Sequence, residues 1–380
     1  MSAPAKIAWI SCVGEKGGAE VTMLQTFRVM DRSRFEPVVI QLRPGPLEKE
    51  LTEMGVTTHV LRKHRMRDLV GVAGAVRSIC RLTREHDLRL YHCNGFRAHA
   101  YGGLARCLTG VPNVVTVHSP EPPGLFTRAL LSLPADQVIA NCTATADHFK
   151  PRGWKSQVVW PGVNETRLAR HTARDVLAAR YGIPASRPWV AMCARLQRHK
   201  GQPHFLRAIA AAAKTHDIQG VLVGAALFGM EEDYAEELRQ QAKDLGIADR
   251  VTFTGFIPDE DVAGFQAGAA VLLHTALLED FGLVLAEANM LGVPVVAFAA
   301  VGPAAIVVPG ETGWLAPVGD QGALDAALAD ALGAPEKRAR FGAAARSRVR
   351  AMFTIEEHTR RTEAIYFRLT EGAETRRRSR

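Results

Sequence analysis

The stretch LLEDFGLVLAEANMLGVPVVA, residues 277–297, decides the fold prediction. It places two acids, Glu279 and Glu287, in an otherwise apolar run. The pattern predicts a strand that ends before Glu279, a helix that begins at Gly282 with Glu287 inside it, and then another strand. Burying an unpaired carboxylate is costly, so each acid needs a partner for its charge. We expect both acids to face one cleft, beside the free N–H groups of the helix start.

Apolar runs alternate with helical stretches on both sides of this segment. Strands are predicted at 6–13, 35–42, 88–94, 113–119, 137–142 and 157–162, and again at 188–195, 218–224, 250–255, 269–275 and 293–299. Helices are predicted between them, near 18–30, 67–86, 98–108, 201–214, 231–245, 259–267 and 282–291. This alternation is typical of parallel βαβ units. The predicted fold class is therefore α/β, with two Rossmann-like doubly wound domains that face a cleft.

Composition excludes several other classes of protein. The 380 residues are 47% hydrophobic and 23% charged, as in an ordinary globular protein, and no run of about 20 uninterrupted apolar residues predicts a membrane span. The six cysteines form no CxxC pair, which indicates buried thiols in a reducing compartment and not a disulfide frame or a metal site. The net charge of +8 suits a phosphate-rich partner, or it reflects only the arginine-rich end at 375–380.

The residues around the two acids indicate a ligand with both phosphate and hydroxyl groups. A helix N-terminus at residues 282–284 favours a phosphate, whereas Glu279 and Glu287 would accept hydrogen bonds from hydroxyls on either side of it. A nucleoside diphosphate sugar fits this arrangement. Arg195 and Lys200 follow another predicted strand and could bind its phosphate oxygens, although alone they would be ordinary surface charges.

Two consecutive glycines after the first strand are a second candidate for binding a phosphate. Gly17 and Gly18 lead into a predicted helix, which lets the backbone come close to a ligand. A tight strand-to-helix turn explains the same two residues equally well. The loop is not a Walker loop, because no GK[ST] follows.

Taken together, the motifs resemble those of the glycosyl transferases group 1. These are retaining enzymes of the GT-B fold with a Glu-x7-Glu motif, and they include phosphatidylinositol mannosyltransferase. The resemblance covers about residues 6–370 and rests on GGAE (17–20), TVHS (116–119), WPGVN (160–164), ARLQRHKG (194–201), VTFTGFIPDEDV (251–262) and EDFGLVLAEANMLGVPVV (279–296). The acid pair followed by Gly-x-Pro-Val-Val is specific, and the order of the weaker motifs along the chain adds to it.

The resemblance implies a role for each matching residue. It implies a catalytic set, in contact with the donor sugar and its diphosphate, of His118, Glu279, Arg195 and Lys200. It implies a donor-binding set of Gly17, Gly18, Arg195, Lys200, Phe256, Ile257, Glu279, Phe281, Gly282, Leu283 and Glu287. In that set Glu287 holds the ribose hydroxyls, Glu279 lies near the hydroxyls of the transferred sugar, and residues 255–258 lie near the base. A core histidine remains the alternative for His118.

Some positions depart from the usual family pattern. Pro161 stands where many relatives carry asparagine, and Asn164 replaces an aspartate. His274 and Thr275 stand where Pro-Ser is common, and EANMLG (287–292) replaces EAMACG. None of these changes removes a charged residue from the implied site, but together they leave the subfamily open.

The resemblance also implies the domain plan. An acceptor-binding Rossmann-like domain is expected over 1–165 and a nucleotide-sugar-binding one over 166–355. A C-terminal helix over 356–372 is expected to cross back to the first domain, followed by a disordered basic tail over 373–380.

The function predicted is a retaining glycosyltransferase that moves a sugar from a nucleotide diphosphate sugar, UDP- or GDP-linked, to an acceptor hydroxyl. A nucleotide-sugar 2-epimerase of the same architecture is the alternative, and a basic nucleic-acid-binding module is a third hypothesis. The module would need basic residues interleaved with aromatic ones, a pattern that is absent from the sequence. We therefore expect no nucleic-acid partner.

Further expectations concern cofactors, the acceptor and the location of the protein. No cofactor and no metal ion is expected, because Arg195, Lys200 and a helix terminus supply the positive charge. The acceptor is a small molecule, a glycan or a lipid. The basic stretch 61–71 could contact an anionic lipid or form a solvated face. The protein is expected in the cytoplasm, and peripheral contact with the membrane is left open. The oligomeric state and the identity of the sugar are also open.

Overall fold

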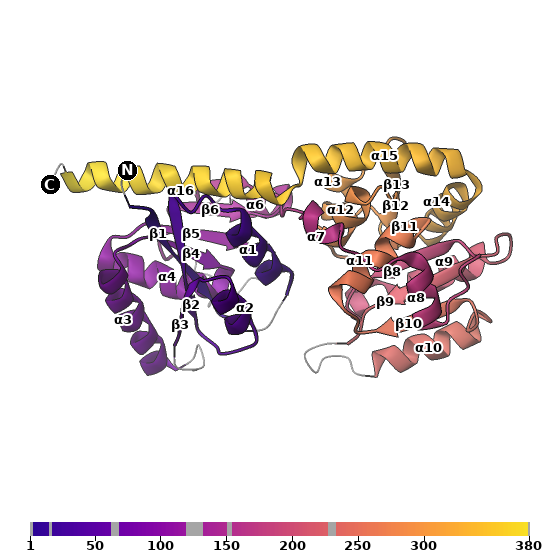
Figure 1. Ribbon diagram of the computed structural model, residues 1–380, viewed down its shortest axis with the longest axis horizontal. Helices are drawn as coiled ribbons and strands as arrows, with labels where there is room; N and C mark the ends of the chain where they lie inside the picture. The colour runs from indigo at the N-terminus through magenta and orange to yellow at the C-terminus, as the bar shows by residue number, and fades with distance from the viewer. Residues whose placement is uncertain are drawn as a thin grey trace. The chain divides into compact units, whose positions relative to one another are not determined.

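The computed structural model describes residues 3–14, 17–61, 68–118, 132–149, 154–226 and 233–378, with side chains through 371. The chain divides into two compact units (Figure 1). The first contains Met1–Gly162 together with Ile355–Arg380, and the second is Val163–Thr354. The division thus falls between Gly162 and Val163, where the sequence had placed it between 165 and 166. Each unit is described by itself.

In the first unit the described strands form one parallel sheet in the order β3-β2-β1-β4-β5-β6-β7. The strands are β1 (Ala5–Ser11), β2 (Phe35–Gln41), β3 (Thr57–Val60), β4 (Leu88–Asn94), β5 (Asn113–Val117), β6 (Gln137–Ala140) and β7 (Ser156–Val158). Their central residues are almost continuously apolar and buried, because helices cover both faces of the sheet. The strand order reverses between β1 and β4, which makes their carboxyl ends the expected ligand edge.

Helices cover the two faces of this sheet in separate groups. They are α1 (Gly18–Val29), α2 (Leu47–Glu53), α3 (Leu69–His86), α4 (Phe96–Thr109), α6 (Thr143–Phe149) and α16 (Ile355–Arg378). Apolar residues of α3 and α4 share one buried cluster with the strands, whereas those of α1, α2 and α16 share another. The sheet is therefore doubly wound, as predicted.

The last helix of the chain, α16, belongs to the first unit and lies along it beside α1 (Figure 1). Tyr366 is fully buried, and its hydroxyl hydrogen-bonds to Nδ1 of His92 in β4. The His92 ring in turn stacks on Trp9 of β1, with 3.7 Å between ring centroids. Helix α16 begins at Ile355 and runs to Arg378, so residues 373–378 are helical where a disordered tail was expected.

The second unit repeats the plan. Its strands form a parallel sheet in the order β10-β9-β8-β11-β12-β13. They are β8 (Trp189–Cys193), β9 (Gln219–Val223), β10 (Val251–Gly255), β11 (Val271–His274), β12 (Val295–Phe298) and β13 (Gly313–Ala316). The helices are α7 (Glu165–Leu168), α8 (Arg174–Tyr181), α9 (Gln202–Ala212), α10 (Tyr234–Asp244), α11 (Asp259–Gly268), α12 (Leu283–Met290), α13 (Val301–Ile306), α14 (Gln321–Gly333) and α15 (Pro335–Met352), with a 3₁₀ turn at Arg198–Lys200. The predicted α/β class is confirmed for both units.

Two further predictions from composition concern the cysteines and membrane-spanning helices. All six cysteines are free thiols. Three of them, Cys93, Cys142 and Cys193, are buried as expected, whereas Cys12 and Cys80 are half-buried and Cys107 is exposed. Among the described helices, none is both long and apolar enough to cross a membrane.

The docking of α16 can be tested with two neighbouring aromatic residues. We expect Tyr366→Ala to lower the free energy of unfolding by about 3–5 kcal/mol, because it removes a fully buried ring from the core. Phe367→Ala is the matched control, because the Phe367 side chain is 41% exposed. This substitution should lower the free energy of unfolding by only about 1 kcal/mol. Urea denaturation of both variants measures the difference. Equal losses would show that α16 does not complete the first unit.

Candidate functional site

The acid pair lies at the point where the second sheet reverses its strand order. The chain runs from β8 outward to β9 and β10, and then returns to β11 on the other side of β8. In an open α/β sheet, the crevice at the carboxyl ends of such a strand pair is the usual ligand site. Lys200 follows β8 and Glu279 follows β11, so the sheet itself brings these two loops together.

Backbone contacts join the two loops. Leu277 N donates to His199 O over 2.8 Å, and Thr275 Oγ1 donates to Gly201 O over 2.8 Å. Gly201 has φ +70°, and a Cβ on it would lie 2.0 Å from the Thr275 carbonyl oxygen. A side chain at Gly201 is therefore excluded both by its left-handed backbone and by the neighbouring loop.

Glu279 is held by two donors on the same oxygen. Lys200 Nζ lies 2.8 Å from Oε2, and His274 Nε2 lies 3.0 Å from it. Burial alone would raise the pKa of Glu279, but the hydrogen bond from His274 and the charge of Lys200 outweigh it and bring the pKa to about 2. Glu279 is therefore ionised at neutral pH. Within the described ranges Oε1 receives no hydrogen bond, which leaves that oxygen for a ligand hydroxyl.

The loop between Glu279 and α12 is fixed through its backbone. Gly302 N donates to Glu279 O over 2.9 Å, and Gly282 has φ +83° as the N-cap residue of α12. The first N–H groups of a helix have no partner within the helix, so the backbone N–H groups of Leu283 and its neighbours can donate to a ligand at the start of α12. The Phe281 side chain is 4% exposed and packs on Phe353, with ring centroids 5.7 Å apart. Phe281 can thus contribute its backbone to a ligand, but its ring belongs to the core.

Glu287 has partners that the sequence analysis missed. Arg167 Nη2 contacts Oε1, and Gln266 Nε2 donates to Oε2 over 3.2 Å. Burial raises the pKa of Glu287, with the charge of Asp259 adding to it and the charge of Arg167 opposing it. Arg167 lies 120 positions before Glu287 in the chain. The one local signal for it is Asn164, which caps α7 by accepting from Arg167 N over 2.9 Å.

The other residues predicted for the donor site are placed as follows. Arg195 comes two residues after β8 and is exposed, and its carbonyl accepts from Gln202 Nε2 over 2.8 Å. After β10, Phe256 is 77% exposed and Ile257 is 7% exposed. Asp259, two residues further on, acts electrostatically on Glu287, so the segment that holds Phe256 and Ile257 leads directly to the surroundings of Glu287.

In the first unit, His118 belongs to a hydrogen-bonded chain at the carboxyl edge of the sheet. His118 Nε2 lies 2.9 Å from Asn94 Oδ1, and Asn94 Nδ2 donates to Glu20 Oε1 over 3.3 Å. Glu20 Oε2 accepts from Gly17 N over 3.2 Å, which ties the glycine loop to the same chain. A carboxylate only accepts, so the Asn94 amide nitrogen faces Glu20 and its oxygen accepts from His118. Glu20, at the end of the quoted GGAE, is a second residue that the predicted set omits.

Burial affects the protonation of Glu20 and His118 in this hydrogen-bonded series. It raises the pKa of Glu20 and lowers the pKa of His118 to about 4. His118 is therefore neutral at pH 7, with its Nε2 hydrogen donated to Asn94 and Nδ1 left as an acceptor. Gly18, the other predicted loop residue, is the first residue of α1, and a Cβ there would meet nothing within 4 Å.

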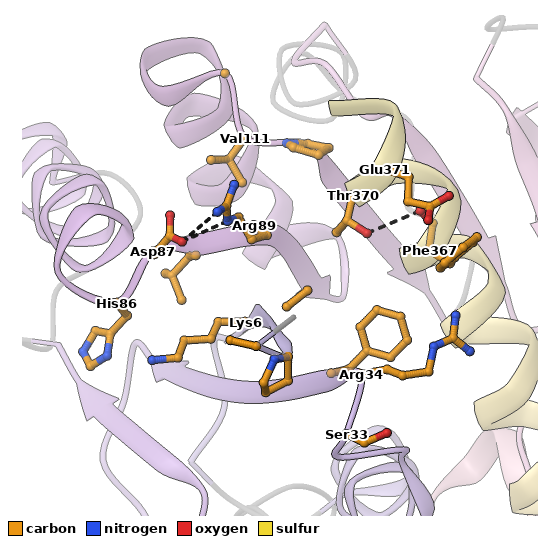
Figure 2. A pocket seen from close by; sticks show the side chains of 17 residues that line it. Lys6, Ser33, Arg34, His86, Asp87, Arg89, Val111, Phe367, Thr370 and Glu371 are labelled. Carbon is orange, nitrogen blue, oxygen red and sulfur yellow. Dashed lines mark hydrogen bonds and ion pairs between the residues drawn. The ribbon is translucent and has the colours of Figure 1, made fainter. Parts of the chain in front are cut away.

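A separate pocket of about 580 Å³ lies at the opposite edge of the first sheet (Figure 2). Residues at the starts of β1, β2 and β4 line it, together with the end of α16. In Figure 2, His86, Asp87 and Arg89 lie on one side and Phe367 and Thr370 on the other. It is remote from the carboxyl ends of the strands and contains none of the predicted site residues.

One Asp-x-Asp spacing bears on the expectation that no metal is needed. Asp259 and Asp261 have this spacing, but Asp261 is 1% exposed and is engaged inside the unit. Its carboxylate accepts from Thr172 Oγ1 over 2.6 Å and from Tyr181 OH over 2.7 Å, and it pairs with Arg180. Asp261 thus stabilises the contact between α8 and α11. Within the described part of the chain, no three His, Cys, Asp or Glu side chains gather as a metal site would require.

The basic stretch 61–71 is only partly visible, because residues 62–67 lie outside the described residues. Leu69 and Val70, at the start of α3, are 79% and 84% exposed.

The close approach of the two loops can be tested with two glycines that share a left-handed backbone. Gly201→Ala should lower the free energy of unfolding by about 3 kcal/mol or more, because conformational strain and a backbone clash add. Gly182→Ala, with φ +64° and nothing within 4 Å of the added Cβ, carries only the strain and should cost about 1–2 kcal/mol. Chemical denaturation of both variants measures the difference. If the two variants lose the same stability, the contact between Gly201 and Thr275 does not hold the loops together.

Comparisons with known proteins agree with this geometry. Residues 174–348 match the family Glycosyl transferases group 1, and residues 16–167 match Glycosyltransferase Family 4. The D-inositol 3-phosphate glycosyltransferase of Streptomyces scabiei is 28% identical over 334 residues, covering 81% of this chain and 74% of that one. The 2-deoxystreptamine N-acetyl-D-glucosaminyltransferase of Streptomyces fradiae is 29% identical over 375 residues, covering 89% and 88%.

A similar solved structure is that of Anabaena HepE in complex with UDP and glucose. It has a TM-score of 0.83 and 26% sequence identity, and the match covers 95% of this chain and 99% of that one. The family matches lie in both units, and the structural match spans both. The second unit therefore carries the Glycosyl transferases group 1 domain, the first carries the Glycosyltransferase Family 4 domain, and the protein is a glycosyltransferase with the GT-B fold.

Proposed function

We propose that this enzyme moves a sugar from a nucleoside diphosphate sugar to an acceptor hydroxyl with retention of configuration at the anomeric carbon. The observation that carries the proposal is Glu279 at the reversal point of the second sheet. Lys200 and His274 both hold its Oε2, so Oε1 would be the oxygen that accepts from a sugar hydroxyl. The similar Anabaena HepE has been crystallised with UDP and glucose and with UDP-glucose, which supports a nucleotide-sugar donor.

The donor would lie along the carboxyl edge of the second sheet. In our proposal Glu287 accepts from the ribose hydroxyls, Glu279 accepts from the transferred sugar, and the segment of Phe256 and Ile257 lies near the base. The diphosphate would meet Lys200, Arg195 and the amides at the start of α12. An ammonium group has three hydrogens, so Lys200 can contact a phosphate while it keeps its bond to Glu279.

Retention would proceed without a covalent intermediate on the protein. Retaining hydrolases place two carboxyl groups about 5 Å apart around the reacting bond. Here both acids have other assignments, since Glu279 is held by Lys200 and His274, and Glu287 by Arg167 and Gln266. The departing diphosphate would instead help to deprotonate the acceptor from the same face. Catalysis would then rest on positioning and on stabilisation of the leaving group by positive charge.

The first unit would supply His118 and the glycine loop. A neutral His118 that donates Nε2–H to Asn94 keeps Nδ1 as an acceptor, suited to a hydroxyl of the donor sugar. The same charge state makes His118 a poor general acid at pH 7. Gly17 and Gly18 would let the backbone come close to the donor, with Gly17 held by Glu20.

The names of two similar enzymes support a proposal for the acceptor class. They are named for D-inositol 3-phosphate and for 2-deoxystreptamine, and both compounds are six-membered carbocycles that carry hydroxyl groups. A compact polyhydroxylated ring is therefore the acceptor to test first, ahead of a glycan or a lipid.

Product analysis tests the function. A thermal-shift panel of UDP-glucose, UDP-N-acetylglucosamine and GDP-mannose selects the donor, because a ligand at 100 times its Kd stabilises the fold by about 2.7 kcal/mol. With that donor and a panel of cyclitols, we expect a glycoside whose anomeric configuration equals that of the donor, as read by NMR. An inverted product would contradict retention. An epimerised sugar nucleotide formed without acceptor would identify a 2-epimerase instead.

The leaving-group role can be tested with two cations of one turn. Lys200→Met should lower kcat by about 10²–10³, because a preorganised charge on the departing diphosphate is lost. Arg198→Met is the control, since Arg198 is paired with Glu237 over 2.8 Å at the surface.

We also expect full wild-type activity in EDTA. Activity that vanishes with the chelator and returns with Mg²⁺ or Mn²⁺ would contradict metal independence.

A further inference from the structure

The two acids of the site are held in different ways. Glu279 receives both donors on Oε2, whereas Glu287 receives one donor on each oxygen. An ionised carboxylate offers about two acceptor positions per oxygen. With Arg167 on Oε1 and Gln266 on Oε2, one acceptor position is left on each oxygen of Glu287. Two adjacent hydroxyl groups of one ligand match this arrangement.

Arg167 is fixed before any ligand arrives. Its backbone N–H is capped by Asn164 Oδ1 at 2.9 Å, and the next residue, Leu168, is 1% exposed. Glu165 of the same short helix pairs with Arg346 of α15 at 3.1 Å. The helix α7 is therefore anchored on two sides, and the guanidinium is presented to Glu287 by a rigid element.

The second partner is equally fixed, and the pair remains accessible. Gln266 is fully buried in α11, and its Nε2 also lies 3.4 Å from Val284 O. The side chain of Arg167 is 25% exposed and that of Glu287 12% exposed. A ligand can thus reach the carboxylate from solvent while both protein donors stay in place.

We propose that Arg167 is a positioning residue of the donor site, which holds Glu287 turned so that its two remaining acceptor positions take the 2′- and 3′-hydroxyls of a ribose. The inference rests on the proposed function, in which Glu287 accepts from the donor ribose. What it adds is the residue that orients Glu287 for that contact. Arg167 itself would not touch the ligand.

Electrostatics gives Arg167 its importance. Burial and the charge of Asp259 raise the pKa of Glu287, whereas the charge of Arg167 and the hydrogen bond from Gln266 oppose that rise. Cys193 of β8 also interacts with Glu287, and burial raises the pKa of its thiol. Without Arg167 the carboxyl would bind a proton more readily, and a protonated carboxyl has fewer acceptor positions. The effect should therefore be largest at low pH and shrink as the pH rises.

The test compares UDP with 2′,3′-dideoxy-UDP on the full-length protein by calorimetric titration at several pH values. In Arg167→Met we expect affinity for UDP to fall by at least about fivefold, because a buried acceptor loses its charged partner. Affinity for the dideoxy compound should equal that of the wild type. The loss of affinity for UDP should become smaller as the pH rises. Arg167→Lys should recover part of the wild-type affinity for UDP. If guanine is the preferred base, GDP and dideoxy-GDP replace these probes.

Arg346→Met is the matched control, because it removes a cation beside α7 that pairs with Glu165 and does not reach Glu287. It should bind both nucleotides like the wild type. The inference is overturned if Arg167→Met binds UDP normally, or if it weakens UDP and dideoxy-UDP equally, which would indicate a role in phosphate binding or only in folding. Glu287→Gln separates the two levels of the argument. If it leaves UDP affinity unchanged, the proposed ribose contact itself fails; if it weakens UDP while Arg167→Met does not, only the role of Arg167 fails.

Discussion

The ion pair between Lys200 and Glu279 is the interaction on which the candidate site depends. A buried carboxylate without a partner is strongly destabilising, and breaking such a pair typically costs about 3–5 kcal/mol. The loops after β8 and β11 must therefore stay in register with each other, and the backbone bonds from Leu277 to His199 and from Thr275 to Gly201 keep them so. The same contacts that stabilise the fold place a cation and an acid where a donor's diphosphate and sugar would meet.

His274 gains a meaning from this arrangement. Its position departs from the family pattern that the sequence resembles, and the sequence alone shows only that the pattern is broken. In the structure its side chain is buried and supplies the second donor to Glu279 Oε2. The substitution thus strengthens the hold on the acid. It also helps to explain why the pKa of Glu279 is lowered whereas that of Glu287, deeper and opposed by Asp259, is raised.

The sequence predicted the architecture because both sheets are parallel and covered on two faces, so that each central strand is a continuous apolar run. It missed β3 and β13, which lie at sheet edges and are only four residues long. It placed Lys200 and Glu279 just beyond the ends of two predicted strands, and the structure brings these two side chains into contact. It did not predict Arg167 as a partner of Glu287, because a hydrogen bond between residues 120 positions apart leaves no local spacing to detect. Glu20 binds the amide of Gly17 only three residues before it, so that partner had a local signal that the prediction overlooked. It also could not show that the Phe281 ring packs inward on Phe353.

The path of α16 has a consequence for synthesis of the chain on the ribosome. Ile365 and Tyr366 belong to the buried cluster of the first unit, yet they are translated after all of the second. The nascent first unit therefore emerges with apolar residues of α1 that α16 does not yet cover, while the contiguous second unit can complete its own core earlier. Exposed apolar surface of this kind favours aggregation. Chaperone dependence should accordingly concentrate in the interval before the final helix leaves the exit tunnel.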